Sequence, residues 1–112
     1  MLPKKFRIPR DILASMRVGG KRYNASDFFI VYKPNTVGHL RACVRVPMSL
    51  SKRSTVRNRI RRLYHECLRF VIPSIALSLD TVLIAKTDIS EQKMQEVKPR
   101  VLDAYLTIQR KK

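Results

Sequence analysis

Acidic residues are scarce in this sequence. Among 112 residues, 24 are lysine or arginine and 8 are aspartate or glutamate. The acidic residues are scattered, at Asp11, Asp27, Glu66, Asp80, Asp88, Glu91, Glu96 and Asp103. No pair of carboxylates is placed to hold catalytic metal ions. The sequence therefore argues against a nuclease that cleaves RNA by itself.

Cysteine and histidine are also sparse. Cys43 and Cys67 form neither a C-x-x-C pair nor a spacing typical of metal ligands, so we expect two free, buried thiols in a reducing cytoplasm. His39 and His65 show no partner at the spacing of a two-histidine nuclease, although only the fold decides whether distant groups converge. We expect no catalytic residue and no metal ligand on this chain.

Long apolar runs are missing as well. No stretch of roughly eighteen apolar residues occurs, so we expect no segment to span a membrane. The basic N-terminus is not followed by an apolar segment and a cleavage site, which predicts a cytoplasmic protein without a signal peptide. Length and the lack of repeats or linkers predict a single domain over residues 1–112.

Positive charge is what the sequence has in excess. The formal net charge is +16 and the isoelectric point is near 10.8. Such a field favours a nucleic-acid partner over an anionic membrane or an acidic protein.

The charge is densest between Ser54 and Arg69. At 3.6 residues per turn, one side of a helix collects Val56, Ile60, Leu63, Cys67 and Val71, with Tyr64 and Phe70 at its edges. The other sides carry Arg57, Asn58, Arg59, Arg61, Arg62, His65 and Arg69. Glu66, four residues after Arg62, is the one acidic residue of the stretch. Because a guanidinium is planar, forked and always charged, it suits phosphate oxygens.

A solvated basic face is the alternative interpretation, because many helices carry charge into water. A face of that kind would alternate charges of opposite sign, whereas these arginines repel one another unless an anion is bound. We therefore interpret this helix as a phosphate-binding surface.

Before the arginine helix, the sequence predicts a short helix and two strands. The helix extends from residue 10 or 11 to about 17, after Pro9, and ends at Gly19 and Gly20. The strands cover residues 28–32 and 40–46, and we expect them to pair as an antiparallel hairpin. In the second strand, arginines alternate with apolar residues, which predicts one solvent-exposed and one buried face. Ser51 or Ser54 is expected to cap the arginine helix.

Beyond the arginine helix, the sequence predicts one more strand and one more helix. Pro73 ends the arginine helix near residues 70–72. Residues 80–86 are apolar enough to form a central strand, and Ser90 is expected to cap a last helix that Pro99 interrupts. The resulting fold class is a small α+β sandwich of order α-β-β-α-β-α, with room for one extra short strand.

The run Arg57-Asn58-Arg59-Ile60-Arg61-Arg62, followed by Glu66, resembles the R-N-R-x-[KR]-R signature of the bacterial ribonuclease P protein subunit. Three further pieces extend the resemblance over nearly the whole chain. They are Leu2-Pro3-Lys4-Lys5 with Arg7, Phe29-Ile30-Val31-Tyr32, and Asp80-Thr81-Val82-Leu83-Ile84-Ala85-Lys86.

The resemblance implies a non-catalytic partner of the ribonuclease P RNA, which removes the 5′ leader of precursor tRNA with Mg²⁺ ions bound by the RNA and no cofactor bound by the protein. It also implies that the arginine helix makes a left-handed crossover between parallel strands, against the usual rule. The implied RNA-binding residues are Arg57, Asn58, Arg59, Arg61, Arg62 and His65, with Lys52 and Arg53 beside them. The implied leader-binding cleft contains Tyr32, Phe28, Ile12, Met16 and Lys86, and Tyr32 would stack on an unpaired base.

Three positions depart from the family pattern. Ile12 and Met16 stand where the family commonly has two phenylalanines, and they pack without stacking as a ring does. His65 stands where arginine is frequent. Met48-Ser49 replaces a basic pair near the end of the second strand, a role that Lys52-Arg53 would take over.

The alternatives differ in class. A structural or ribosomal-type RNA-binding protein would share the charge and size, but it would have no reason to prefer leader-bearing tRNA over mature tRNA. A basic membrane-surface protein is less favoured, because the arginine face has no broad exposed apolar stripe beside it.

Overall fold

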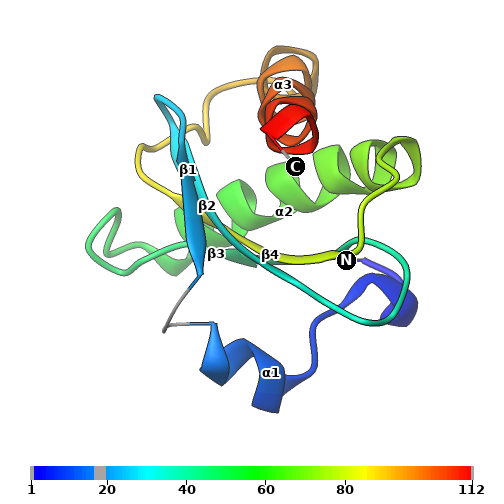
Figure 1. Cartoon of the computed structure of the whole chain (residues 1–112). Coiled ribbons are helices and arrows are strands. Elements are labelled where there is room, and N and C mark those ends of the chain that lie inside the picture. The colour runs from blue at the N-terminus through cyan, green and yellow to red at the C-terminus, as the bar shows by residue number, and fades with distance from the viewer. Residues whose placement is uncertain (1, 17–19, 112) are drawn as a thin grey trace.

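A four-stranded sheet lies between helices in the computed structural model, which describes residues 2–16 and 20–111 (Figure 1). The long helices α2 (Ser54–Val71) and α3 (Met94–Lys111) cover one face of the sheet, and the short α1 (Arg10–Ser15) lies across the other. The strands are β1 (Lys21–Asn24), β2 (Phe28–Pro34), β3 (Arg41–Arg45) and β4 (Leu79–Ala85). Two 3₁₀ turns, η1 (Lys4–Phe6) and η2 (Ile72–Ser74), complete the chain. The predicted element order is confirmed, and β1 is the extra short strand.

The strands are arranged in the order β1-β2-β4-β3. The predicted hairpin between β2 and β3 is wrong, because β4 lies between them and Val82 pairs with Val31 on one side and Cys43 on the other. β4 is antiparallel to β2 and parallel to β3, so α2 is the connection between two parallel strands. β4 takes the central place because nearly all of its residues are buried, which requires cover on both faces and both edges.

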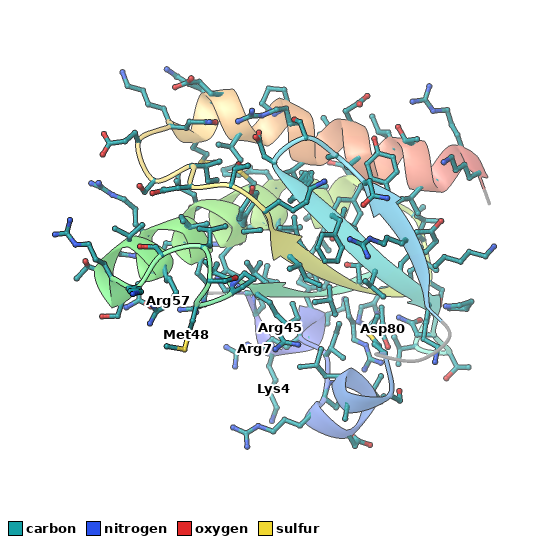
Figure 2. All side chains as sticks on the ribbon, turned by 90° about the vertical axis from the view of Figure 1, so that its left-hand side faces the viewer. Lys4, Arg7, Arg45, Met48, Arg57 and Asp80 are labelled. Carbon is teal, nitrogen blue, oxygen red and sulfur yellow. The ribbon has the colours of Figure 1, made fainter. Side chains whose placement is uncertain are left out.

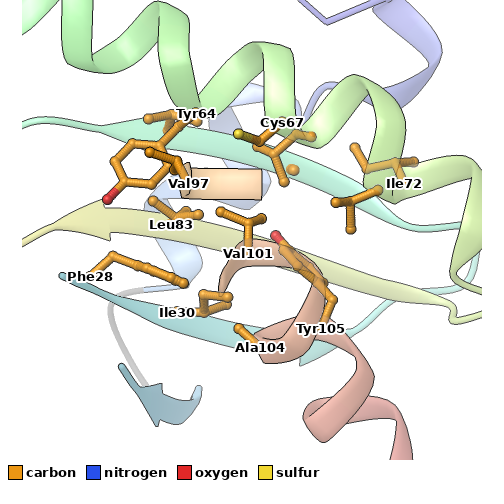
Figure 3. Close-up of a cluster of buried hydrophobic side chains, with 14 of the residues drawn as sticks. Phe28, Ile30, Tyr64, Cys67, Ile72, Leu83, Val97, Val101, Ala104 and Tyr105 are labelled. Atoms are coloured by element: carbon orange, nitrogen blue, oxygen red, sulfur yellow. The ribbon is translucent and has the colours of Figure 1, made fainter. Parts of the chain in front are cut away.

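The core fills the space between the sheet and the two long helices. Alternate residues of the strands point into it, including Phe28 and Ile30 of β2 and Leu83 of β4 (Figure 3). The ring of Tyr105 on α3 is fully buried there, and its hydroxyl is hydrogen-bonded to Thr81 Oγ1 at 2.7 Å. This packing fixes which face of the sheet remains for α1.

The buried face of α2 is rotated relative to the face that the sequence predicted. Its buried residues are Ile60, Tyr64, Cys67, Leu68 and Val71. Tyr64, expected at the edge, is therefore central, while Val56 and Leu63 are only partly buried. The helix ends at Val71, within the predicted range of residues 70–72, and Pro73 lies in the following turn η2.

The predicted caps of both long helices are wrong. The residue before α2 is Arg53, without a side-chain cap hydrogen bond; Ser51 Oγ instead accepts from the Arg53 backbone N–H at 3.3 Å. α3 begins at Met94 rather than after Ser90, because Glu96 reaches back and accepts from the Lys93 backbone N–H at 3.1 Å. The helix then continues through Pro99, the residue expected to interrupt it.

The basic N-terminal segment packs against the sheet instead of extending into solvent. Leu2 is buried, and Arg7 Nε donates to its backbone oxygen at 2.7 Å. Arg7 also forms a parallel bridge with Ala42 of β3. His39 Nε2 is hydrogen-bonded to the Lys5 backbone oxygen at 2.8 Å. Lys4, Arg7 and Arg10 are thereby placed along the sheet rather than on a free arm.

A buried ion pair between Arg41 and Asp80 lies on the face of β3 that the sequence predicted to be solvent-exposed. Arg41 Nε and Nη2 donate to the two carboxylate oxygens of Asp80 at 2.7 and 2.9 Å. Asn35 Nδ2 donates to the same carboxylate at 2.9 Å. The hydrogen bond and the charge of Asp80 raise the pKa of Arg41 against the effect of burial. This bidentate pair fixes β3 against β4 beneath α1.

Candidate nucleic-acid interface

Two pairs of arginines lie on opposite sides of α2. The first row is formed by Arg57 and Arg61; burial raises the pKa of the Cys43 thiol in β3, while the positive charge of Arg61 lowers it. Arg57 is tied to the preceding loop, where its Nη1 donates to the Ser51 backbone oxygen at 2.7 Å. Figure 2 shows Arg57, Arg45, Arg7 and Lys4 along this side of the molecule.

The second row, Arg59 and Arg62, borders the segment that leads into α3. Both line a hollow with Glu91 and a second hollow with Met94. Within the described ranges, neither arginine makes a hydrogen bond or an ion pair. Lys52 and Arg53 are exposed at the start of α2, and Arg53 lines the same hollow as the second row. Glu91 and Glu66 line these hollows without forming an ion pair with Arg59 or Arg62, so both guanidinium groups can still meet an external anion.

Asn58 and Glu66 each have a partner on the same helix. Asn58 Oδ1 accepts from Arg61 Nη1 at 2.7 Å, which holds the guanidinium on the helix surface. Glu66 pairs with Arg69 at 3.2 Å and not with Arg62, the partner suggested by the i,i+4 spacing. The one acidic residue of α2 thus forms no ion pair with either arginine row.

His65 extends the first row by one turn of the helix. Burial lowers the pKa of His65 below its usual value, and the charges of Arg61 and Arg7 lower it further. The imidazole is therefore neutral at neutral pH in the free protein. An anion bound beside His65 would favour the protonated form of the imidazole.

The sheet face beneath α1 forms a second element of the interface, which we call the trough. It is lined by Leu13 and Met16 from the α1 side and by Val31, Arg45, Val82 and Ile84 from three strands. These strand residues alternate with those that point into the core, so they share the face opposite α2 and α3. Arg10 and Ala14 continue the lining beside Arg45.

Cations surround this apolar floor. The Arg22 guanidinium lies over the Phe29 ring, 3.8 Å from its centroid, on the strand pair next to the trough. Arg45 lies at the other side, and its charge acts on the half-buried Cys43 thiol, whose pKa is raised chiefly by burial. An apolar floor with cationic walls suits a chain that combines flat bases with phosphates.

The residues predicted to form the leader-binding cleft lie in different parts of the structure. Met16 lines the trough, and Ile12 is half-buried on α1. Phe28 and Tyr32 are buried in the core, on the face of the sheet opposite the trough, so the structure does not bring them together with Met16. Val31 and Phe29 lie on the other face of β2, the face that carries the trough, since a shift of one residue exchanges the faces of a strand. Lys86 is exposed just after β4.

Sequence reasoning missed most of the trough. The alternation of arginines with apolar residues in β3 had placed Arg45 on the solvent-exposed face of the strand. The same alternation indicated that Cys43 and Arg45 share one surface. Nothing in the sequence indicated that Leu13, Val82 and Ile84 meet there, because their contact depends on the strand order.

The described residues show neither a metal centre nor a spanning segment. No three of their histidine, cysteine and acidic side chains cluster as ligands of one ion. None of their helices combines the length and apolar character needed to cross a membrane. Cys43 and Cys67 are both free thiols, and burial raises the pKa of Cys67 to about 11.

Comparison with known proteins gives consistent results. A family model described as Ribonuclease P matches residues 4–109. The chain is 30% identical over 95 residues to the ribonuclease P protein component of Desulfovibrio desulfuricans, which covers 81% of this chain and 72% of that protein.

Solved structures show the same fold at lower identity. The RNase P protein from Thermotoga maritima matches with a TM-score of 0.74 and 23% identity, covering 88% of this chain and 94% of that one. An RNase P protein mutant from Staphylococcus aureus matches with a TM-score of 0.77 and 21% identity, covering 94% of this chain and 88% of that one.

Proposed function

Because the chain belongs to the ribonuclease P protein component family, we propose that it is the non-catalytic subunit of a bacterial ribonuclease P holoenzyme in the cytoplasm. In this role it binds the catalytic RNA and the 5′ leader of precursor tRNA, and it assists removal of the leader. The observation that supports this proposal most directly is a helix whose two arginine rows form no ion pair with its one acidic residue, on a protein whose opposite sheet face carries an apolar trough lined by Arg45.

The protein contributes electrostatics rather than bond cleavage. Two RNAs repel each other through their phosphates, and fixed guanidinium groups lower this repulsion wherever they replace bound counterions. Asp80 and Glu66 are already engaged in ion pairs with Arg41 and Arg69. We assign the Mg²⁺ ions that hydrolysis requires to the RNA.

The two parts of the interface serve different RNA contacts. The arginine rows and Asn58, with Lys52 and Arg53, suit the folded catalytic RNA, because contacts to phosphates fix position without reading sequence. The trough suits an unpaired strand: bases can lie on Val31, Val82 and Ile84 while phosphates meet Arg45. Met16 gives this contact apolar surface without a stacking ring, so sequence readout of the leader should be slight.

A reconstitution experiment tests the proposal. Precursor tRNA is incubated at low Mg²⁺ concentration with a bacterial ribonuclease P RNA, with and without the protein, and with the protein alone. We expect cleavage at the mature 5′ end only when RNA and protein are both present. Cleavage by the protein alone would show a nuclease site on this chain and refute the non-catalytic role.

A structural RNA-binding protein without a processing role is the competing proposal, supported by the same charge. The two differ in their preference for the leader. If the protein bound precursor and mature tRNA equally well in the presence of the catalytic RNA and did not stimulate cleavage, the structural role would replace the one proposed.

A further inference from the structure

A cavity of about 220 Å³ lies on the helix-covered side of the sheet, and neither the arginine rows nor the trough includes it. It is bounded by the turn between β1 and β2, by α3 and by one residue of α2. The lining residues that carry the argument are Tyr23, Asp27, Phe28, Tyr64, Val97 and Arg100.

Tyr64 presents an unused hydrogen-bond donor to this cavity. The residue is 1% exposed, and its hydroxyl has no hydrogen-bond partner among the described residues. Its ring is fixed against Phe28 with centroids 5.7 Å apart, and Figure 3 shows the hydroxyl projecting beyond the core cluster beside Phe28. Burial and the charge of Asp27 raise the pKa of Tyr64, so the hydroxyl keeps its proton. A buried hydroxyl without a partner lowers stability, which makes an external acceptor favourable.

Asp27, which lines the same cavity, has a carboxylate oxygen that accepts no hydrogen bond within the described part of the chain. Its Oδ1 accepts from Thr87 Oγ1 at 3.1 Å. Its Oδ2 forms an ion pair with Arg100 but accepts no hydrogen bond from the described residues. Since a carboxylate oxygen has two lone pairs, Oδ2 retains capacity for an N–H donor.

A matching ligand must carry a donor and an acceptor side by side on a flat, largely apolar group. The Watson–Crick edge of every unpaired nucleobase has this pattern, and its faces suit the aromatic and aliphatic walls formed by Phe28 and Val97. We propose that this cavity binds an unpaired nucleobase, which accepts from the Tyr64 hydroxyl and donates to Asp27. The proposal rests on the proposed function only for the source of the base, an RNA bound to the protein.

Phosphate-free ribonucleosides test the site without engaging the arginine rows. Each of the four is titrated into the full-length protein, and NMR shifts of the Val97 and Val101 methyl groups are followed. We expect saturable shifts with at least one nucleoside. Binding should weaken about tenfold in Tyr64→Phe and in Asp27→Asn, the effect of losing one hydrogen bond that involves a charged or fully buried group. N3-methyluridine, which lacks the N–H donor, should bind less tightly than uridine if uridine is the ligand.

Tyr105→Phe is the matched control, because it removes a buried hydroxyl that already has a partner and lies outside the cavity lining. It should leave nucleoside binding unchanged. Tyr64→Phe should melt at the wild-type temperature or above, which shows that its loss of binding is not a loss of folding. Absence of saturable shifts, as when only water fills the cavity, or equal binding by wild type and Tyr64→Phe, would overturn the proposal.

Addition of ribonuclease P RNA distinguishes the source of the base. Displacement of the nucleoside by the RNA would support an RNA base as the natural occupant, and persistence of nucleoside binding would assign the cavity to a free nucleoside. Stimulated cleavage without nucleoside binding would overturn the cavity proposal alone. Nucleoside binding without stimulated cleavage would overturn the proposed function and retain the cavity as a nucleobase site.

Discussion

Replacing Arg57, Arg59, Arg61 and Arg62 together with alanine should lower RNA affinity and flatten its dependence on salt. Each phosphate contact contributes about 0.7–0.9 to the slope of log K against log salt concentration, so loss of four contacts should reduce the slope by about 3–4. The fold should remain, because none of the four lies on the buried face of α2. The internal cost is the loss of two hydrogen bonds, to Ser51 and Asn58, at about 1 kcal/mol each or less.

Splitting the variant by rows makes the test sharper. Alanine at Arg57 and Arg61 alone, or at Arg59 and Arg62 alone, should each remove about half of the change in slope if both sides of α2 contact phosphate. The corresponding lysine variants should keep most of the slope while losing affinity, because lysine retains the charge but not the fork. A slope change confined to one row would restrict the interface to that side of the helix.

Fluorescence anisotropy with labelled ribonuclease P RNA, titrated at several salt concentrations, measures the slope directly. Circular dichroism of each variant shows whether the helices persist. Alanine at Arg110 and Lys111, exposed at the end of α3, removes two charges away from α2 and should leave the slope unchanged. An unchanged slope in a folded quadruple variant would refute the assignment of α2 as the phosphate-binding surface.

Three other perturbations test the ion pair, the trough and the histidine. Asp80→Ala should lower the free energy of unfolding in urea by about 3–5 kcal/mol, because the charge of Arg41 is left buried, whereas Asp103→Ala on the exposed side of α3 should change it little. Val31→Glu puts a negative charge on the trough floor and should weaken binding of precursor tRNA more than of mature tRNA; equal weakening would exclude the trough as the leader site. The pKa of His65 is lowered in the folded state, so its contribution to stability is complete above the unfolded value of about 6.5 and is lost as pH falls through the folded value. Unfolding in urea at pH 7.5 and 5.5 should therefore show a smaller pH effect in His65→Gln than in the wild type, and identical pH effects would contradict the burial of the imidazole.

Only part of the site could be predicted from the sequence. The arginine rows could be predicted because a helix repeats every 3.6 residues, so Arg57 and Arg61 must lie on one side of the helix wherever it packs. The trough could not be predicted, because Val31 and Val82 are far apart in the chain and meet only through strand pairing. The sequence could not decide which face of the sheet Tyr32 takes, because a tyrosine in a strand can point to either side, and the structure places it in the core.

The sequence by itself determined the elements and the excess charge, since periodicity, proline positions and composition act within a few residues. It placed α2 before Pro73, gave β4 the apolar character of a central strand and left the arginines without acidic partners. Tertiary structure decided the insertion of β4 between β2 and β3, the face of the sheet that α1 covers and the buried pairing of Arg41 with Asp80. These features depend on contacts between segments distant in the chain, and such contacts are selected by the burial of the whole core rather than by any local pattern.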